Sequence, residues 1–245
     1  MIRYALAPHR PAWAAQLGIP LTLPADPARA PADAAGARPA DWLPPTPPAA
    51  ATPRTHTVAI TFDDGPHPEG TALILDALAR HGAHATFFVV GEQVIARPQL
   101  LQRAREEGHA IALHGYRHRL HLRRSAADLR EDFARGITAI EDATGHTPTH
   151  HRPPYGIYSP ASLAIARELQ LQPLLWSAWG KDWRGLTTPA RIAGRVLLQL
   201  ADRDVILLHD ADFYSARRSH ERTAAALETV LTALGSGGFG TVLCA

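Results

Sequence analysis

From residue 57 onward, short runs of consecutive apolar residues alternate with longer segments in which apolar residues recur every three or four positions. The short runs predict buried strands, and the longer period predicts amphipathic helices. The expected strands cover residues 58–62, 85–90, 110–113, 149–151, 173–177, 205–208 and 239–243. The expected helices cover residues 69–80, 93–107, 125–144, 188–200 and 221–234, with one more beginning at Ser159-Pro160.

The regular alternation of seven strands with helices predicts an α/β fold. Such an order favours parallel strands, arranged either as a barrel or as a doubly wound sheet. In an α/β barrel the carboxyl ends of all strands share one face, and active sites lie there. Polar residues that follow the strands are therefore expected to meet.

Residues 1–55 have a different composition. They are rich in Ala and Pro, with Pro-Pro pairs at 44–45 and 47–48. This composition predicts an N-terminal extension that is poorly ordered or loosely docked, with no part in catalysis. Trp13, Trp42 and Leu43 are the side chains in it that can dock. Residues 56–245 are then expected to form the folded domain.

The composition is that of ordinary soluble globular protein, with 46% hydrophobic and 20% charged residues. A net charge of only +2 gives no argument for a nucleic-acid partner. No run reaches the roughly 18 apolar residues of a membrane span, and no intact signal peptide is visible. The single cysteine, Cys244, excludes an intramolecular disulfide. We expect a monomer that is cytoplasmic by sequence alone.

Fourteen histidines exceed what packing requires and point to metal or proton chemistry. His114 and His118 are four residues apart, close enough on a helical turn or compact loop to bind one metal ion. Asp63 and Asp64 follow the first strand, where their mutual repulsion calls for cationic neighbours. One can ligate the metal while the other acts as a general base. The alternative for the acidic pair is a simple polar turn.

Arg152 can pair with that base and keep it ionised. A surface ion pair would be its default interpretation without the Pro153-Pro154-Tyr155 segment that fixes the loop around it. His209 ends the apolar run 205–208, where it can serve as a general acid with Asp182 as its partner. Two histidines and one carboxylate leave an open position for water, as in hydrolytic zinc sites. The basic run from Arg117 to Arg124 is interpreted as a solvated face that attracts anions.

Five segments, taken in order, resemble the motifs of the polysaccharide deacetylases, the carbohydrate esterase family 4 enzymes that share the NodB homology domain. The segments are Thr61-Phe62-Asp63-Asp64-Gly65-Pro66, His114-x3-His118, Arg152-Pro153-Pro154-Tyr155, Asp182-Trp183 and Leu207-Leu208-His209-Asp210. Each motif alone is weak, whereas five in order are specific. The resemblance extends from about Thr57 to the C-terminus.

The resemblance implies a distorted (β/α)7 barrel of the NodB type and hydrolytic N-deacetylation of amino sugars by a metal-bound water. It implies that Asp64, His114 and His118 bind one divalent ion, with Zn²⁺ favoured and Co²⁺ or another ion as alternatives. The other implied roles are Asp63 as base with Arg152 as its partner, His209 as acid oriented by Asp182, Tyr155 as oxyanion donor, and Trp183 and Leu207 as walls of the acetyl pocket.

Two positions depart from the family pattern. Gly115 stands where Ser or Thr is usual, which puts the rigidity of the histidine loop in question. Trp179 stands where an aspartate is common, which suggests an altered sugar-binding surface. The run from His209 to Ser215 is interpreted as a source of further substrate contacts, with a simple polar loop as the alternative.

The expected substrate is an N-acetylated glycan of the peptidoglycan, chitin or exopolysaccharide type, a class that favours the cell envelope or secretion over the cytoplasm. The alternatives are a smaller amide or an O-acetyl ester as substrate, or a barrel that binds carbohydrate without catalysis.

Overall fold

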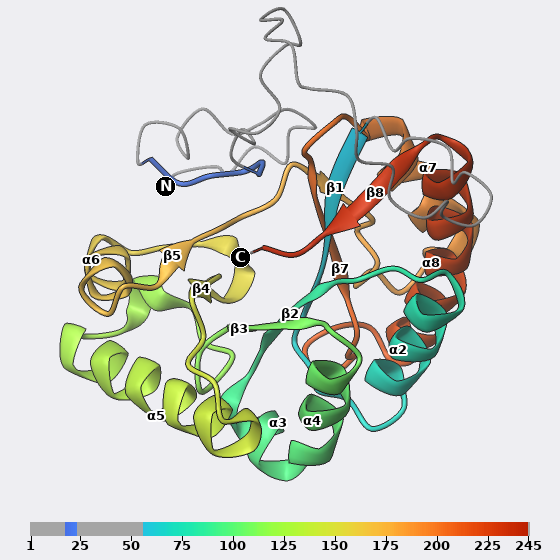
Figure 1. The fold of residues 1–245 in the computed structure, drawn as a ribbon. Coiled ribbons are helices and arrows are strands. Elements are labelled where there is room, and N and C mark those ends of the chain that lie inside the picture. Colours follow the sequence, from blue (N-terminus) through green and yellow to red (C-terminus); the bar gives the residue numbers. More distant parts are fainter. Residues whose placement is uncertain (1–17, 24–55, 245) are drawn as a thin grey trace, which may run out of the picture.

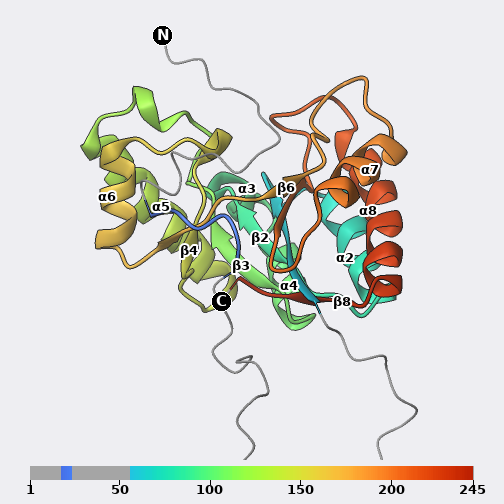
Figure 2. The ribbon, with the colours of Figure 1, turned by 90° about the horizontal axis from the view of Figure 1, so that it is seen from above.

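Eight parallel strands form one curled sheet, and helices surround it on the outside (Figures 1 and 2). This computed structural model describes residues 18–23 and 56–244. The strands are β1 (His56–Asp63), β2 (Thr86–Val89), β3 (Ala110–Leu113), β4 (His150–His151), β5 (Gln172–Pro173), β6 (Ala178–Trp179), β7 (Val205–His209) and β8 (Phe239–Val242). Their order is β5-β4-β3-β2-β1-β7-β6, with β8 paired to the first half of β1.

The helices alternate with the strands as the sequence predicts. They are α2 (Gly70–Arg80), α3 (Gly91–Ala96), α4 (Pro98–Glu106), α5 (Ala126–Thr144), α6 (Pro160–Glu168), α7 (Pro189–Gln199) and α8 (Ser219–Ser236), with short 3-10 turns η2 (His121–Arg123) and η3 (Pro154–Gly156). None of the described helices is long and apolar enough to cross a membrane. The distorted (β/α)7 barrel expected from the sequence is confirmed as the architecture.

Strand β1 shows how the sequence sorts the two faces of the sheet. Val58, Ile60 and Phe62 are fully buried in the larger hydrophobic cluster, which lies between strands and helices. The alternate residues point the other way, and along the strand they change from apolar Ala59 through Thr61 to Asp63. The barrel interior thus becomes polar towards the carboxyl ends of the strands.

Strand register brings the catalytic candidates together. Thr61 of β1 pairs with Leu207 of β7, and Asp63 pairs with His209. Because paired residues of neighbouring parallel strands point to the same face, Asp63 and His209 project side by side into the interior. Trp179 of β6 pairs with Leu207 and therefore shares that face.

The strand expected at residues 173–177 is wrong. The chain instead forms two short strands, β5 and β6, on opposite edges of the sheet. The N–H of Leu174 donates to the carbonyl of His151 in β4, whereas the N–H of Ser177 donates to the carbonyl of Val205 in β7. The four residues between β5 and β6 thus cross the opening of the barrel, which no ladder closes.

The helix expected at residues 93–107 is two helices. Pro98 lacks an N–H and excludes the residue before it from helical geometry, and Arg97 accordingly adopts φ −146° and ψ 54° between α3 and α4. The caps expected for α5 are confirmed. The Ser125 side chain accepts from the N–H of Asp128, and Gly145 ends the helix with φ 69°.

The described part of the N-terminal extension packs against the barrel. Ile19 is buried in the larger cluster, and the Pro20 carbonyl accepts from the N–H of Leu175 in the barrel opening. Thr22 forms an antiparallel bridge with Asp204. Trp13, Trp42 and Leu43, which the sequence offers as docking side chains, lie outside the described residues. The division of the chain at residue 55 stays a prediction.

Candidate active site

Arg152 lies at the centre of the barrel interior and is fully buried. Its Nη1 donates to Asp63 Oδ1 at 2.6 Å and to Thr61 Oγ1 at 2.8 Å. Its Nε and Nη2 donate to the carbonyls of Leu174 and Leu175 at 3.1 and 2.9 Å. A buried guanidinium is tolerated when its donors are used in this way. Arg152 therefore fixes one oxygen of Asp63 and leaves the other facing the site.

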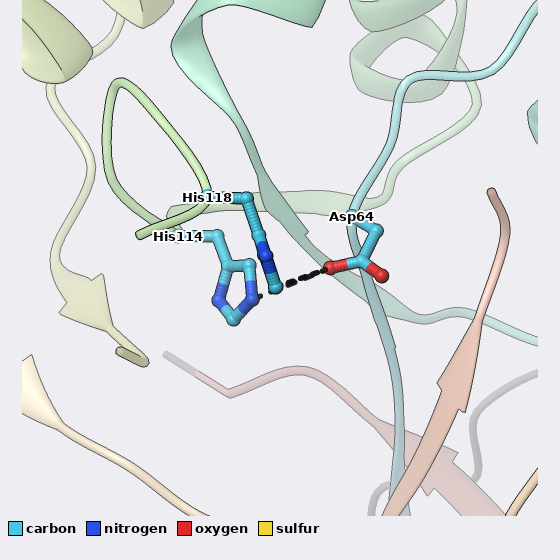
Figure 3. Close-up of side chains that lie close together, drawn as sticks. All are labelled: Asp64, His114 and His118. Atoms are coloured by element: carbon cyan, nitrogen blue, oxygen red, sulfur yellow. Dashed lines mark ion pairs between the residues drawn. The ribbon is translucent and has the colours of Figure 1, made fainter. Parts of the chain in front are cut away.

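Asp64, His114 and His118 converge on one point from two segments of the chain (Figure 3). Asp64 Oδ1 lies 3.5 Å from His114 Nε2 and 3.3 Å from His118 Nε2. Asp64 follows β1 with φ 83°, a left-handed conformation that turns its side chain away from the path of the strand. The ligand atoms of the three residues all lie within 4.8 Å of one another.

The donor set fits a divalent metal ion. Nδ1 of His114 lies 2.8 Å from the Arg152 carbonyl, so it carries the ring proton and Nε2 presents a lone pair. Asp64 Oδ1 is buried with no hydrogen-bond partner among the described residues. Two imidazoles and one carboxylate are a common zinc set with room for further ligands.

The protonation states suit such a site. Burial alone would raise the pKa of Asp64, but the neighbouring His114, His209 and His118 hold that pKa below its ordinary value. Burial lowers the pKa of His118 to about 4, against the charge of Asp64. At neutral pH both groups are thus in the deprotonated form that coordinates metals.

The loop between the two histidines is compact rather than helical, and Asp132 of α5 holds it. Its carboxylate accepts from the N–H of Tyr116 at 2.8 Å and from the N–H of Arg117 at 3.1 Å. Gly115 adopts φ 100°, which disfavours any side chain, and an added Cβ would lie 3.0 Å from Asp132. Asp132 thus holds the loop through its carboxylate, although Gly115 has no hydroxyl group to contribute. No motif in the sequence identifies Asp132.

His118 is fixed by aromatic rings. Tyr214 stacks on it at 4.2 Å with 9° between the ring planes, and Tyr155 meets it edge-on at 4.6 Å. The Tyr214 hydroxyl donates to Glu92 at 3.0 Å and accepts from Gln93 at 3.2 Å, so α3 anchors the ring. Nδ1 of His118 has no hydrogen-bond partner in the described chain. Stacking therefore takes the place of the hydrogen bond that usually orients a ligand histidine.

We expect Tyr214→Ala to weaken zinc binding by about 10-fold or more, the range found when groups that orient a ligand are removed. Tyr214→Phe should keep most of the affinity because the stacked ring remains. Competition with a chromophoric chelator measures both dissociation constants. Phe213→Ala is the matched control, since this ring contacts Arg97 and His67 and meets the edge of Tyr214 at 6.2 Å, but contacts no ligand residue. Equal dissociation constants for Tyr214→Ala and Phe213→Ala would contradict the role of Tyr214.

His209 and Asp182 form an ion pair in which Asp182 is fully buried and His209 is partly buried. Asp182 Oδ1 lies 2.9 Å from His209 Nδ1, and Oδ2 accepts from the His209 N–H at 2.7 Å and from Thr223 of α8 at 2.8 Å. Burial acts to lower the pKa of His209, but the charge and hydrogen bond of Asp182, with Asp64 and Asp63, raise it to about 10. His209 is therefore a protonated donor at neutral pH.

The remaining candidate residues differ in their exposure to solvent. Tyr155 is 59% exposed and has φ 63°, a strained conformation of the kind that functional sites retain. Trp183 meets the His209 ring edge-on at 5.5 Å. Leu207 is buried on the same interior face as Thr61. The structure thus brings all ten candidate residues of the sequence to one end of the barrel.

A second group of possible ligands consists of His67, Asp212 and His220. Nδ1 of His67 accepts from the N–H groups of Gly70 and Glu69 at 2.9 and 3.2 Å. The ring proton must then sit on Nε2, which lies 3.4 Å from Asp212. Because a protonated nitrogen cannot coordinate a metal, this group ties the loop after β7 to the start of α2.

Comparison with known proteins gives a consistent picture. The family model described as polysaccharide deacetylase matches residues 50–174. The peptidoglycan-N-acetylglucosamine deacetylase PgdA of Listeria monocytogenes is 36% identical over 182 residues, which are 74% of this chain and 36% of that protein. The chain thus spans about a third of that relative's length. A chitooligosaccharide deacetylase of Bradyrhizobium sp. is 34% identical and matches 76% of this chain and 87% of that protein.

A similar structure has also been solved. It is a family 4 acetyl xylan esterase from Clostridium thermocellum in complex with a cobalt ion, 30% identical, with a TM-score of 0.69. The match covers 76% of this chain and 87% of that one. The family model covers more than half of the chain, and the rhizobial relative is matched over most of its length. This chain therefore belongs to the polysaccharide deacetylase family.

Proposed function

We propose that the chain hydrolyses the N-acetyl group of an amino sugar within a glycan. The observation that carries this proposal is the placement of Asp63 and His209 on paired positions of β1 and β7, beside the Asp64, His114 and His118 cluster. The two groups have opposite proton-transfer roles, and each is held by its own buried partner. Hydrolysis of an amide requires such a pair.

Asp63 acts as the base. Its Oδ1 is held by Arg152, and its Oδ2 lies 3.9 Å from His114 Nε2, at the edge of the metal cluster. There it can accept the proton of a water that attacks the acetyl carbonyl. The backbone N–H of Tyr155 is proposed to donate to the carbonyl oxygen as negative charge develops on it.

His209 acts as the acid. As the carbon–nitrogen bond breaks, the ring gives its proton to the departing nitrogen, and the products are acetate and a free amine. Asp182 keeps the ring protonated and oriented through both of its oxygens. Trp183 and Leu207 are proposed to enclose the acetyl methyl group.

Asp64, His114 and His118 are proposed to hold one divalent ion, with zinc favoured by the donor set and cobalt or another ion as alternatives. When bound, such an ion supplies Lewis acidity and lowers the pKa of a water molecule. The cobalt in the related esterase supports a metal-dependent family chemistry.

The names of the relatives favour peptidoglycan or chitin oligomers as the glycan. For a wall polymer the site of action would be the cell envelope or the outside of the cell. One chain supplies every residue of the site, which supports action as a monomer. Hydrolysis of an O-acetyl ester is the second candidate, because the related esterase shares the architecture.

The test is acetate release by the zinc- or cobalt-loaded chain from a panel of substrates. The panel contains N-acetylglucosamine oligomers, peptidoglycan fragments and O-acetylated xylan of matched length. We expect release from at least one N-acetylated oligomer. Release from the xylan ester alone would favour the esterase. Saturable binding without release from any substrate would leave a carbohydrate-binding barrel.

A further inference from the structure

Lys181 is the only lysine among the 25 lysine and arginine residues of the chain. It lies between β6 and Asp182 with φ 53°, a left-handed conformation that is rare for residues with a side chain. The residues before and after Lys181 in the chain are both held in place. Gly180 packs so closely that an added Cβ would lie 2.7 Å from Ile192 and 2.8 Å from Leu208, and Asp182 is bound to His209.

The lysine lies on an aromatic row that leads away from the catalytic histidine. The Trp183 ring is 5.5 Å from His209, and the Trp179 ring is 5.4 Å from Trp183. Nζ of Lys181 lies 4.6 Å above the centre of the Trp179 ring. All three side chains are only partly buried. Trp179 also lies 5.8 Å from Trp176, so the row lines the barrel interior beside His209 and keeps its partly exposed part at Trp179, Lys181 and Trp183.

The charge of Lys181 has no carboxylate partner among residues 18–23 and 56–244. The nearest acid in sequence, Asp182, already uses both oxygens on His209 and Thr223. Arg117 differs in this respect, since its Nε lies 3.8 Å from Glu92. An amine held at the edge of an active site without a counter-ion is available to an anionic ligand.

We propose that Trp179 and Lys181 form a subsite for a sugar that carries a carboxylate, next to the N-acetylated sugar at the catalytic centre. This proposal rests on the proposed function and narrows its substrate class. The indole face suits the C–H face of a pyranose ring, and the flexible ammonium can leave the ring to bind the carboxylate. The carboxylate can belong to a lactyl ether, as in muramic-type sugars, or to a uronic acid.

A lysine label tests binding directly, without turnover. Reductive methylation with ¹³C-formaldehyde marks Lys181 and the N-terminal amine, and the Lys181→Arg variant assigns the two signals. Neutral N-acetylglucosamine oligomers are compared with oligomers of equal length that carry a lactyl or a uronic carboxylate. We expect a saturable shift of the Lys181 signal with at least one carboxylated oligomer, and a clearly smaller shift with the neutral oligomer.

Kinetics test specificity. Lys181→Gln should raise KM for the carboxylated oligomer by about tenfold or more, as expected when one charge-assisted hydrogen bond is lost, and leave kcat unchanged. Its KM for the neutral oligomer should not change, which also shows that the variant is folded. Lys181→Arg should restore most of the affinity. Arg184→Gln removes a neighbouring exposed charge and should have a clearly smaller effect.

Two results would overturn the subsite. One is a Lys181 signal that responds to no carboxylated oligomer, and the other is an equal loss in Arg184→Gln, which would indicate general attraction by charge. Failure of the proposed function is distinguishable from both. In that case no N-acetylated substrate releases acetate, while the Lys181 signal still reports whether carboxylated sugars bind.

Discussion

Asp63→Asn is expected to abolish acetate release while leaving the bound metal in place. Asparagine has the shape of aspartate and can still accept from Arg152 through its amide oxygen, so the buried contact survives. It cannot take a proton from water, and loss of a general base lowers turnover by about 10²–10⁴-fold. Steady-state acetate release and metal analysis of the same preparation measure the two effects.

Two further variants make the result specific. Asp64→Asn should lose the metal and the activity together, because Asp64 Oδ1 is the atom that faces both histidines. His209→Ala should keep the metal and lose turnover, as the acid is removed. An Asp63→Asn enzyme that retains more than a tenth of the wild-type turnover would remove Asp63 from the role of base.

Much of this arrangement could be predicted from the sequence, because the relevant information is local. The alternation of apolar and polar residues from Val58 to Asp63 defines a strand with one face towards the helices. Strand β7 has no such alternation, because residues 205–208 are all apolar, and the orientation of His209 follows from its pairing with Asp63. Once both strands are parallel neighbours, their carboxyl ends must share a face. The five motifs then identify which polar residues lie there.

The residues that the sequence did not reveal act over long distances. Asp132 holds the histidine loop from α5, and Thr223 reaches Asp182 from α8. Neither residue differs from an ordinary helix residue in its local pattern. Tyr214 lies in the run after His209 that was expected to contact substrate, but the structure places its ring on His118. Such roles depend on packing between elements far apart in the chain.

The helix expected at residues 93–107 and the strand expected at residues 173–177 differ from the structure for different physical reasons. Pro98 was a local signal for the break between α3 and α4, which the helical spacing of the apolar residues concealed. The split of residues 173–177 had no such signal, because residues 173–176 are all apolar. The segment passes from β4 to β7, which are not neighbours in the sheet. An apolar run indicates that a segment is buried. Which edge of the sheet the segment joins depends on which strands have unpaired backbone groups beside it.

Arg152→Met is expected to lower the free energy of unfolding by about 3–5 kcal/mol, the usual cost of removing one partner from a buried ion pair. Methionine fills part of the space but leaves Asp63 and the carbonyls of Leu174 and Leu175 without their donor. Urea denaturation of the metal-free chain measures the change, and turnover should be lost in the same variant.

The double variant Arg152→Met/Asp63→Asn separates the two sources of that cost. If the buried charge of Asp63 dominates, its removal should recover a large part of the lost stability, and the double variant should be more stable than Arg152→Met alone. If the two are equally unstable, the cost arises from the unpaired carbonyls. Activity should stay absent in both cases, because the ion pair that stabilises this barrel interior also holds the base that the reaction uses.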